Sequence, residues 1–311
     1  MEIREEFGLR IALLNAEEAL GGADRLAAPP GVTLLRVPDP PAGAWPQLAA
    51  RGFVRKPAWI SWLSDVAGSE AEWLTRLPSA HAIAIRRARK QVGADVRIGW
   101  EHPVSEQLLD EFLELYEDMI SRMSHGVPFA VSQREDILEN KNNFLVYARS
   151  VEGLEGACVC RADRDDDTVV MRFPAYSPHG RRHSLSRVLY MEVMNLARAW
   201  GYARMSLGKD PNLYGHISKT GLFEFKARRL GFTPYATEPP FGLVPWRDEA
   251  DLIVSWDGLS NPALLLGYAD EVSSAPDGFV LEVFGDAAGL DGMESLPFVR
   301  RVRHHQLDFG R

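Results

Sequence analysis

The sequence predicts an α+β fold in which a mixed, mostly antiparallel sheet is flanked by helices. Two long segments, 106–123 and 185–197, repeat apolar residues at helical spacing. Between them lie three apolar, strand-like runs that short turns connect, which predicts a meander (144–149, 156–161 and 168–173). The run 203–207 follows the second helix, so a strand, a loop, a helix and a strand close this part of the chain.

The chain is predicted to have three parts. Residues 1–78 form a small α/β segment with strand candidates at 9–14 and 32–37. The main α+β domain covers 79–236. Prolines 239, 240 and 245 then mark a linker, and further strand-like runs follow within 237–311. We expect these C-terminal strands to complete the N-terminal segment.

Composition excludes several classes of protein. Of the 311 residues, 46% are hydrophobic and 25% charged, as in ordinary soluble globular proteins. The acidic N-terminus predicts no signal peptide, and no apolar run approaches the ~20 residues of a membrane span. A net charge of −8 gives no general attraction to polyanions. The two cysteines, Cys158 and Cys160, alternate on a strand and are expected to be buried thiols, which suits a cytoplasmic protein.

The junction between the loop and the helix at 185–197 has the character of a phosphate site. The first N–H groups of a helix are free, and its dipole favours negative charge there. Small residues let a phosphate approach the backbone, and arginines add charge-assisted hydrogen bonds. The residues predicted to bind an anionic group here are Arg181, Arg182, His183, Ser184, Leu185 and Ser186.

The spacing Arg-x-x-small-x-small resembles the pyrophosphate loop of the GNAT acyltransferases, which usually reads Gln/Arg-x-x-Gly-x-Gly/Ala. Ser184 and Ser186 stand where that loop has glycines. Asn212 after the second strand and the Leu-Gly-Phe at 230–232 are also similar to the superfamily, whereas the tyrosine that many members have is Ala227 here. The resemblance implies a GNAT fold, in which two neighbouring central strands part and an acyl donor enters between them.

The Fem-type branch of this superfamily gives a narrower resemblance. The segment 221–226 followed by Gly-Phe is similar to that branch, as is the basic helix at 85–96. Tyr116 and Arg122 match the branch's tyrosine and arginine. The branch includes peptidoglycan-bridge aminoacyltransferases and relatives that aminoacylate small metabolites. The resemblance covers about 73–234, and a tandem GNAT-like arrangement is one architecture that it implies.

Acyl transfer needs a route for the amine's proton and a charge near the oxyanion. The acid/base candidates are Tyr214, His216, His179, His183 and Lys226. Lys226, next to Phe225, is carried over from the Fem-type pattern, in which an aromatic-Lys pair lies at the transferase cleft. A surface lysine on an amphipathic helix is the open alternative for this position. We predict Lys226, Tyr214 and His216 as catalytic residues, with Asn212 and Phe225 at the donor.

The acceptor side is predicted from position. Arg122 and Tyr116 follow the resemblance, although Tyr116 also suits the core of its helix. Tyr176 lies in the segment 174–177, whose backbone N–H groups would donate to the oxyanion. No metal site is expected, because the acidic run 163–167 matches no calcium loop.

The leading hypothesis is an N-acyltransferase that moves an acyl or aminoacyl group onto an amine of a small metabolite or peptide. No Gly-x-Ser-x-Gly elbow occurs, so direct attack on the donor is favoured. The loop at 181–186 favours acyl-CoA, whereas the basic helix and Phe225-Lys226 favour aminoacyl-tRNA. Two alternatives remain: an inactive module that binds CoA, a nucleotide or a peptide, and a nucleic-acid-binding protein that uses 86–90. No membrane partner is expected, and the sequence leaves the oligomeric state open.

Overall fold

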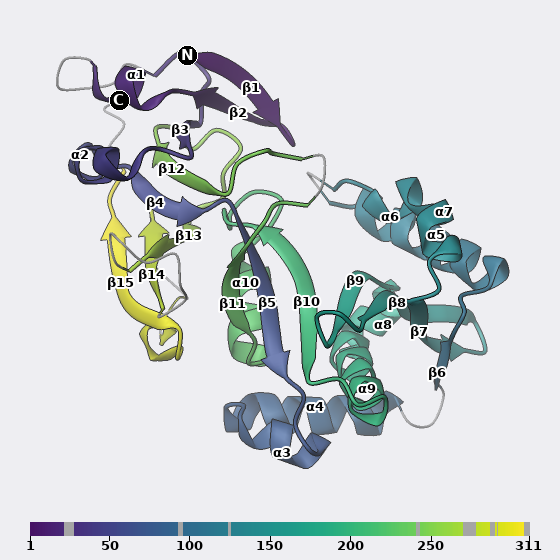
Figure 1. Cartoon of the computed structure of the whole chain (residues 1–311). Coiled ribbons are helices and arrows are strands. Elements are labelled where there is room, and N and C mark those ends of the chain that lie inside the picture. Colours follow the sequence, from purple (N-terminus) through teal and green to yellow (C-terminus); the bar gives the residue numbers. More distant parts are fainter. Residues whose placement is uncertain are drawn as a thin grey trace. The chain divides into compact units, whose positions relative to one another are not determined.

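The structure is a computed structural model that describes residues 1–21, 28–92, 96–123, 126–240, 243–269, 278–286, 290 and 292–307 (Figure 1). The chain divides into two compact units. Unit 1 combines Met1–Ser61, Lys209–Ala227 and Thr233–Arg311, and unit 2 combines Trp62–Gly208 with Arg228–Phe232. These boundaries differ from those expected at 78 and 236, because the segment after the second strand of the central motif groups with the two ends of the chain.

Unit 2 contains the predicted meander. Strands β6 (Arg97–Glu101), β7 (Asn143–Ser150), β8 (Gly153–Asp163) and β9 (Thr168–Tyr176) pair antiparallel in succession. Beyond β9 lie β10 (Arg204–Pro211), which is parallel to it, and then β5 (Trp59–Asp65). The sheet is therefore mixed and mostly antiparallel, and the predicted α+β class is confirmed.

Two long amphipathic helices pack on this sheet. Helix α5 (Glu106–Ser121) begins at Ser105, whose side chain accepts a hydrogen bond from Leu108 N, and it packs on β8 and β9. Helix α9 (Leu185–Ala199) buries the apolar stripe that the sequence shows and packs on β7, β8 and β9. Figure 1 shows the two helices on opposite sides of these strands.

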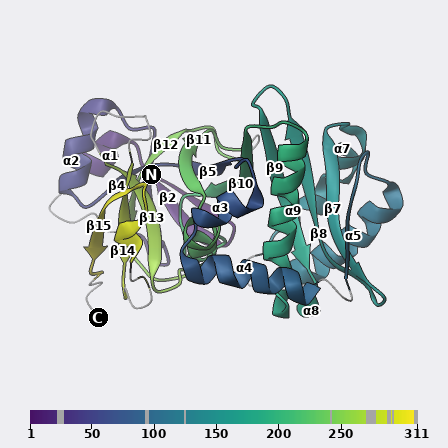
Figure 2. The same cartoon turned by 90° about the horizontal axis from the view of Figure 1, so that it is seen from below.

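The other helices of unit 2 are shorter or lie beside these two. Helix α4 (Ser79–Val92) packs against α9, and Figure 2 shows the two helices crossing. The remaining helices are α3 (Glu70–Thr75), α6 (Phe129–Ser132), α7 (Arg134–Glu139) and α8 (Pro178–Arg182). Cys158 and Cys160 on β8 are fully buried, as predicted, and burial raises the pKa of the Cys160 thiol.

Unit 1 brings the two ends of the chain into one sheet. Its five strands have the order β1 (Glu2–Glu6), β2 (Leu9–Leu13), β3 (Leu34–Pro38), β12 (Asp248–Ile253) and β4 (Val54–Pro57). Strand β12 pairs antiparallel with both β3 and β4. A strand from the C-terminal part therefore fills a central position between two strands of the N-terminal part.

A second sheet of unit 1 comprises β13 (Ala263–Tyr268), β14 (Phe279–Phe284) and β15 (Val299–His305). Strand β11 (Thr233–Thr237) lies next to β5 in the strand order. The helical elements of unit 1 are α1 (Ala16–Leu20), η1 (Ala42–Ala44), α2 (Trp45–Ala50), α10 (Thr220–Glu224) and η3 (Met293–Ser295). The π-helix η2 (Phe225–Arg229) directly continues α10.

Candidate functional site

The predicted phosphate turn lies between α8 and α9 in unit 2. Ser177 follows β9 and caps α8, since its Oγ accepts a hydrogen bond from Gly180 N at 2.9 Å. Ser184 then connects α8 to α9 with a left-handed backbone (φ 57°). Glycine adopts this conformation most easily, and Ser184 stands where the resembled loop has its first glycine. The serine at this position therefore takes up the backbone conformation that a glycine would favour.

The first amides of α9 are available to a ligand. Leu185 N and Ser186 N have no hydrogen-bond acceptor among the described residues, while Arg187 N donates to Ser184 O at 3.0 Å. The amides of His183 and Ser184 are used by the turn of α8. Two adjacent free N–H groups at the positive end of a 15-residue helix suit an anionic oxygen.

The side chains of this turn are mostly accessible. Arg181 and Arg182 are exposed, whereas Leu185 is buried. The His183 ring packs 4.2 Å from the His179 ring, and its Nδ1 lies 3.0 Å from His179 O. Two exposed arginines that closely precede two free amides in the sequence suit the binding of a phosphate.

Strands β9 and β10, both described in full, pair only over their first residues. Their parallel register covers Thr168 to Val170 on β9 and Arg204 to Ser206 on β10. From Met171 to Tyr176, β9 does not pair with β10. The chain then leads into α8. Gly208 on β10 has a positive φ of 76°, which interrupts the extended backbone of this strand. The resemblance predicts such a parting of two central strands beside the loop.

Two of the three predicted catalytic residues meet on one carboxylate in unit 1. Lys226 Nζ lies 2.8 Å from both carboxylate oxygens of Asp210, and Tyr214 donates its hydroxyl to Asp210 Oδ2 at 3.1 Å. Asp210 lies near the end of β10, and Lys226 lies on the π-helix η2. Lys226 is 5% exposed, which excludes the alternative of a surface lysine.

Sequence reasoning missed Asp210. Its position near the end of a buried strand, four residues before Tyr214, is the signal that could have indicated it. The π-helix was also missed, although such turns often occur at functional positions because the extra residue redirects the following side chains. The buried lysine depends on Asp210, since an isolated charge in this position would be strongly destabilising.

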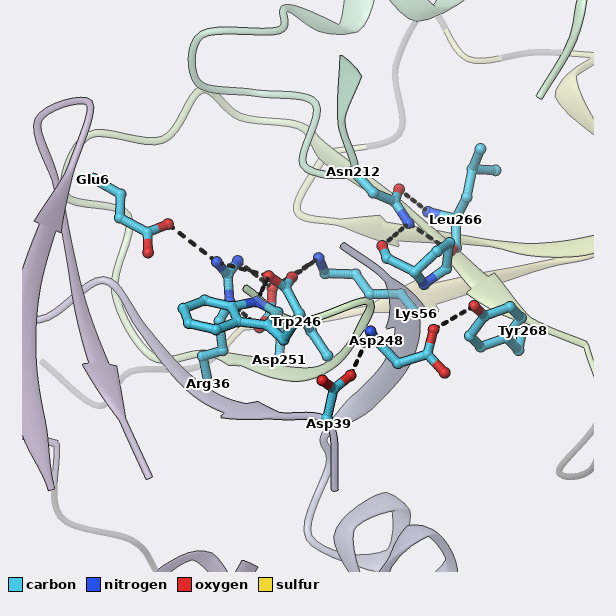
Figure 3. A network of polar contacts seen from close by, with 12 residues as sticks. Glu6, Arg36, Asp39, Lys56, Asn212, Trp246, Asp248, Asp251, Leu266 and Tyr268 are labelled. Atoms are coloured by element: carbon cyan, nitrogen blue, oxygen red, sulfur yellow. Dashed lines mark hydrogen bonds and ion pairs between the residues drawn. The ribbon is translucent and has the colours of Figure 1, made fainter. Parts of the chain in front are cut away.

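His216 and Asn212 hold unit 1 together. The two ring nitrogens of His216 each lie 2.8 Å from a backbone carbonyl oxygen, Nδ1 from Gly258 and Nε2 from Phe7. Asn212 donates both amide hydrogens, to Pro57 O and Leu266 O, and accepts from Leu266 N (Figure 3). In this geometry neither ring nitrogen of His216 is open to an incoming amine, and the Asn212 amide has no hydrogen left to donate.

The remaining predicted residues differ in how deeply they are buried. Tyr116 is buried against Phe112 and Phe173, with ring centroids 5.7 and 6.0 Å away, and burial raises the pKa of its hydroxyl. Arg122 is exposed and pairs with Asp118 at 2.7 Å. Tyr176 is 9% exposed, and burial raises the pKa of its hydroxyl well above the usual range. Phe225 is half-buried.

The basic helix α4 has both structural and exposed cations. Arg89 pairs with Glu70 and with Glu192 on α9, each at 2.6 Å. Arg86, Arg87 and Lys90 are exposed, and residues 93–95 at the end of the predicted basic stretch lie outside the described residues. In the described part of the chain no three or more His, Cys, Asp or Glu side chains are arranged to hold a metal. None of the helices there has the length and apolar character needed to cross a membrane.

No protein-family model matches the sequence. No curated protein sequence matches it either. Among solved structures, the chain is similar to FemX, with a TM-score of 0.47 and 13% identity over 79% of this chain and 80% of that one. It is also similar to L-PGS from Bacillus licheniformis, with a TM-score of 0.39 and 13% identity over 71% and 68% of the two chains.

A third similar structure is a tandem GNAT protein from the clavulanic acid biosynthesis pathway. Its TM-score is 0.39, with 14% identity over 71% of this chain and 63% of that one. At such low identity the likeness concerns the fold alone.

Proposed function

We propose that this protein is an N-acyltransferase that moves an acyl or aminoacyl group from an activated donor to an amine of a small metabolite or peptide. The observation that carries the proposal is the start of α9. Two free amides, Leu185 N and Ser186 N, follow the left-handed Ser184, and two exposed arginines flank them. This arrangement fits a phosphate group of the donor, which acyl-CoA and aminoacyl-tRNA both have.

The reaction is a direct displacement. The amine nitrogen attacks the acyl carbonyl carbon, a C–N bond forms, and the bond to the leaving sulfur of CoA or ribose oxygen of tRNA breaks. The nitrogen loses one proton and the leaving group gains one. Positioning of the two reactants supplies much of the rate in such a reaction.

The Asp210 cluster is assigned to positioning. Lys226 and Tyr214 both bind the Asp210 carboxylate, and the three residues are at most 6% exposed, so they join the end of β10 to η2. We assign His216 to positioning of the surrounding backbone, because its ring nitrogens face two carbonyl oxygens.

A second candidate is a module that binds CoA, a nucleotide or a peptide without turnover. It is favoured by the internal hydrogen bonds that occupy Asn212, Tyr214 and His216. The donor could bind at α9 in both cases. Turnover therefore separates the two candidates, and donor binding does not.

The test measures donor binding and transfer separately. The chain is titrated with CoA by calorimetry and is incubated with labelled acetyl-CoA or charged tRNA and a panel of amines. Arg181→Ala and Arg182→Ala should each weaken donor binding several-fold with little change in melting temperature. Arg301→Ala, an exposed arginine on β15, is the matched control and should bind like the wild type. Binding without transfer would favour the second candidate, and absence of any donor binding would refute the assignment of the α9 turn.

A further inference from the structure

Unit 1 contains a cavity of about 310 Å³, a size that accommodates a small organic molecule. Its walls are mainly apolar and come from β2, β5, the loop after β10 and the segment before β12. The apolar lining residues that matter here are Leu9, Ile11, Trp59, Leu213, Ile217 and Val244. Charged side chains from β1, β3, β4 and β12 also line it, among them Glu6, Arg36, Lys56 and Glu249.

These four residues belong to one network of ion pairs, most of it buried (Figure 3). Arg36 forms two hydrogen bonds with Asp251, at 2.8 and 2.9 Å, and its Nη1 lies 3.0 Å from Glu249. Lys56 Nζ lies 2.5 Å from Glu249 and 3.1 Å from Asp251. These side chains are at most 7% exposed, so two buried cations are matched by two buried carboxylates.

Glu6 is a third carboxylate in this network. Its Oε2 accepts a hydrogen bond from Arg36 Nη1 at 3.2 Å, and its Oε1 has no partner among the described residues. Its side chain is 21% exposed and lines the cavity. With Glu6 ionised, the network therefore has one more negative charge than positive charge, and one carboxylate oxygen is left to accept a hydrogen bond.

In the described part of the chain, none of the other polar groups at the cavity is paired with Glu6. At the rim, Arg4 pairs with Glu2 at 2.7 Å, and Glu5 is exposed. His216 also lines the cavity, but both of its ring nitrogens contact backbone carbonyl oxygens. An anionic ligand would find Arg36 and Lys56 already paired, whereas a cation would complete the pairing of Glu6.

We infer that this cavity binds an organic cation, with an ammonium group at the Glu6 carboxylate and an apolar body against Trp59 and Val244. The inference does not depend on the proposed transferase, because it requires neither a donor nor turnover. Binding of a cation would also favour the ionised form of Glu6. Burial raises the pKa of this carboxyl, and Glu249 and Asp251 raise it further against the opposing effect of Arg36 and Lys56. Affinity should therefore increase as the pH rises through that pKa.

The test compares three probes with the same phenyl body by calorimetry on the full chain. They are 2-phenylethylammonium, 2-phenylethanol and 3-phenylpropanoate. The ammonium should bind at least about tenfold more tightly than the alcohol, a difference typical of one charge-assisted contact. Glu6→Gln should remove this tenfold preference. Glu2→Gln, on the same strand but paired with Arg4, should bind like the wild type.

A second variant locates the probe even if Glu6→Gln does not fold well. Val244→Trp fills the cavity and should abolish binding of the ammonium without requiring any change of charge. Equal affinity for alcohol and ammonium, tighter binding of the carboxylate, unchanged affinity in Glu6→Gln or in Val244→Trp, or binding of none of the probes would each overturn the inference. Each of these outcomes is a measurement of probe binding and involves no acyl transfer. Failure of this inference can therefore be distinguished from failure of the transferase proposal.

Discussion

Lys226 Nζ lies 2.8 Å from both carboxylate oxygens of Asp210, and the two side chains are 6% and 9% exposed. Taking two charges out of water is costly, and their attraction offsets that cost only when both are present. Tyr214 adds a hydrogen bond to the same carboxylate. This buried pair joins the end of β10 to the π-helix η2, so it positions the residues of both elements.

Removal of one member of this pair should destabilise the protein strongly. Lys226→Met leaves Asp210 as an uncompensated buried charge, and we expect a loss of about 3–5 kcal/mol in the free energy of unfolding. The double variant Lys226→Met/Asp210→Leu should recover much of that loss, because no charge remains buried. Urea unfolding of both variants measures this. Equal destabilisation of the single and double variants would show that the pair is not coupled.

The left-handed backbone at Ser184 predicts an unusual order of substitutions. A β-branched residue is strained at a φ of 57°, so Ser184→Val should lower the free energy of unfolding by about 1–2 kcal/mol. Ser184→Gly should be close to neutral, because relief of strain offsets the greater entropy of glycine in the unfolded chain. Thermal unfolding of both variants measures the difference.

The control for this position is Ser186→Val, two residues further into α9, where the backbone is helical. It should cost less than Ser184→Val. If both valine variants lose the same stability, the left-handed conformation of Ser184 is not the cause. Calorimetry with CoA adds a functional check, since Ser184→Gly keeps the turn and should keep donor binding.

The sequence predicted local elements well, because their signals are local. The apolar repeat of α9 and the strand-like runs of β7 to β9 are both contained in short segments, and the structure confirms them. The position of Lys226 was predicted from a resemblance to a family, whereas its partner Asp210 was not.

The features that the sequence did not predict depend on pairing between distant segments. Strand β12 pairs with β3 and β4, about 200 residues earlier in the chain. Arg36, Lys56 and Asp251 are buried on these strands, although charged residues on a strand are usually expected to face water. Only the assembled sheet brings their charges together, so neither the buried network nor the cavity beside it could be predicted from composition or periodicity.

Asn212 should be important for stability through three hydrogen bonds. Its amide donates to Pro57 O and Leu266 O and accepts from Leu266 N, with distances of 3.0, 2.9 and 2.9 Å. Asn212→Ala leaves these buried backbone groups without partners, and we expect a loss of about 3 kcal/mol in the free energy of unfolding. Urea unfolding measures it. Asn142→Ala, an exposed asparagine in a turn, is the control and should change stability by less than about 0.5 kcal/mol.

The raised pKa of Glu6 gives stability a definite dependence on pH. Burial is the main cause, and Glu249 and Asp251 add to it against Arg36 and Lys56. Between the unfolded pKa of about 4.3 and the higher folded pKa, the native state holds a proton that the unfolded state has lost. The stability that this proton adds is fully present below the unfolded pKa, and it is lost as the pH rises through the folded pKa. The glutamine in Glu6→Gln does not titrate, so this variant has no such contribution at any pH.

Glu6→Gln should therefore gain stability relative to the wild type as the pH is raised from about 4 to about 8, so its free energy of unfolding minus that of the wild type should increase. Urea unfolding at several pH values measures this difference. Glu2→Gln is a control of opposite sign, because a hydrogen bond from Arg4 lowers the pKa of Glu2 in the folded state. The stability of Glu2→Gln relative to the wild type should decrease or stay constant over the same pH range. A flat difference for Glu6→Gln would mean that Glu6 is ionised in the folded protein as readily as in the unfolded chain, and that water screens it from the neighbouring carboxylates.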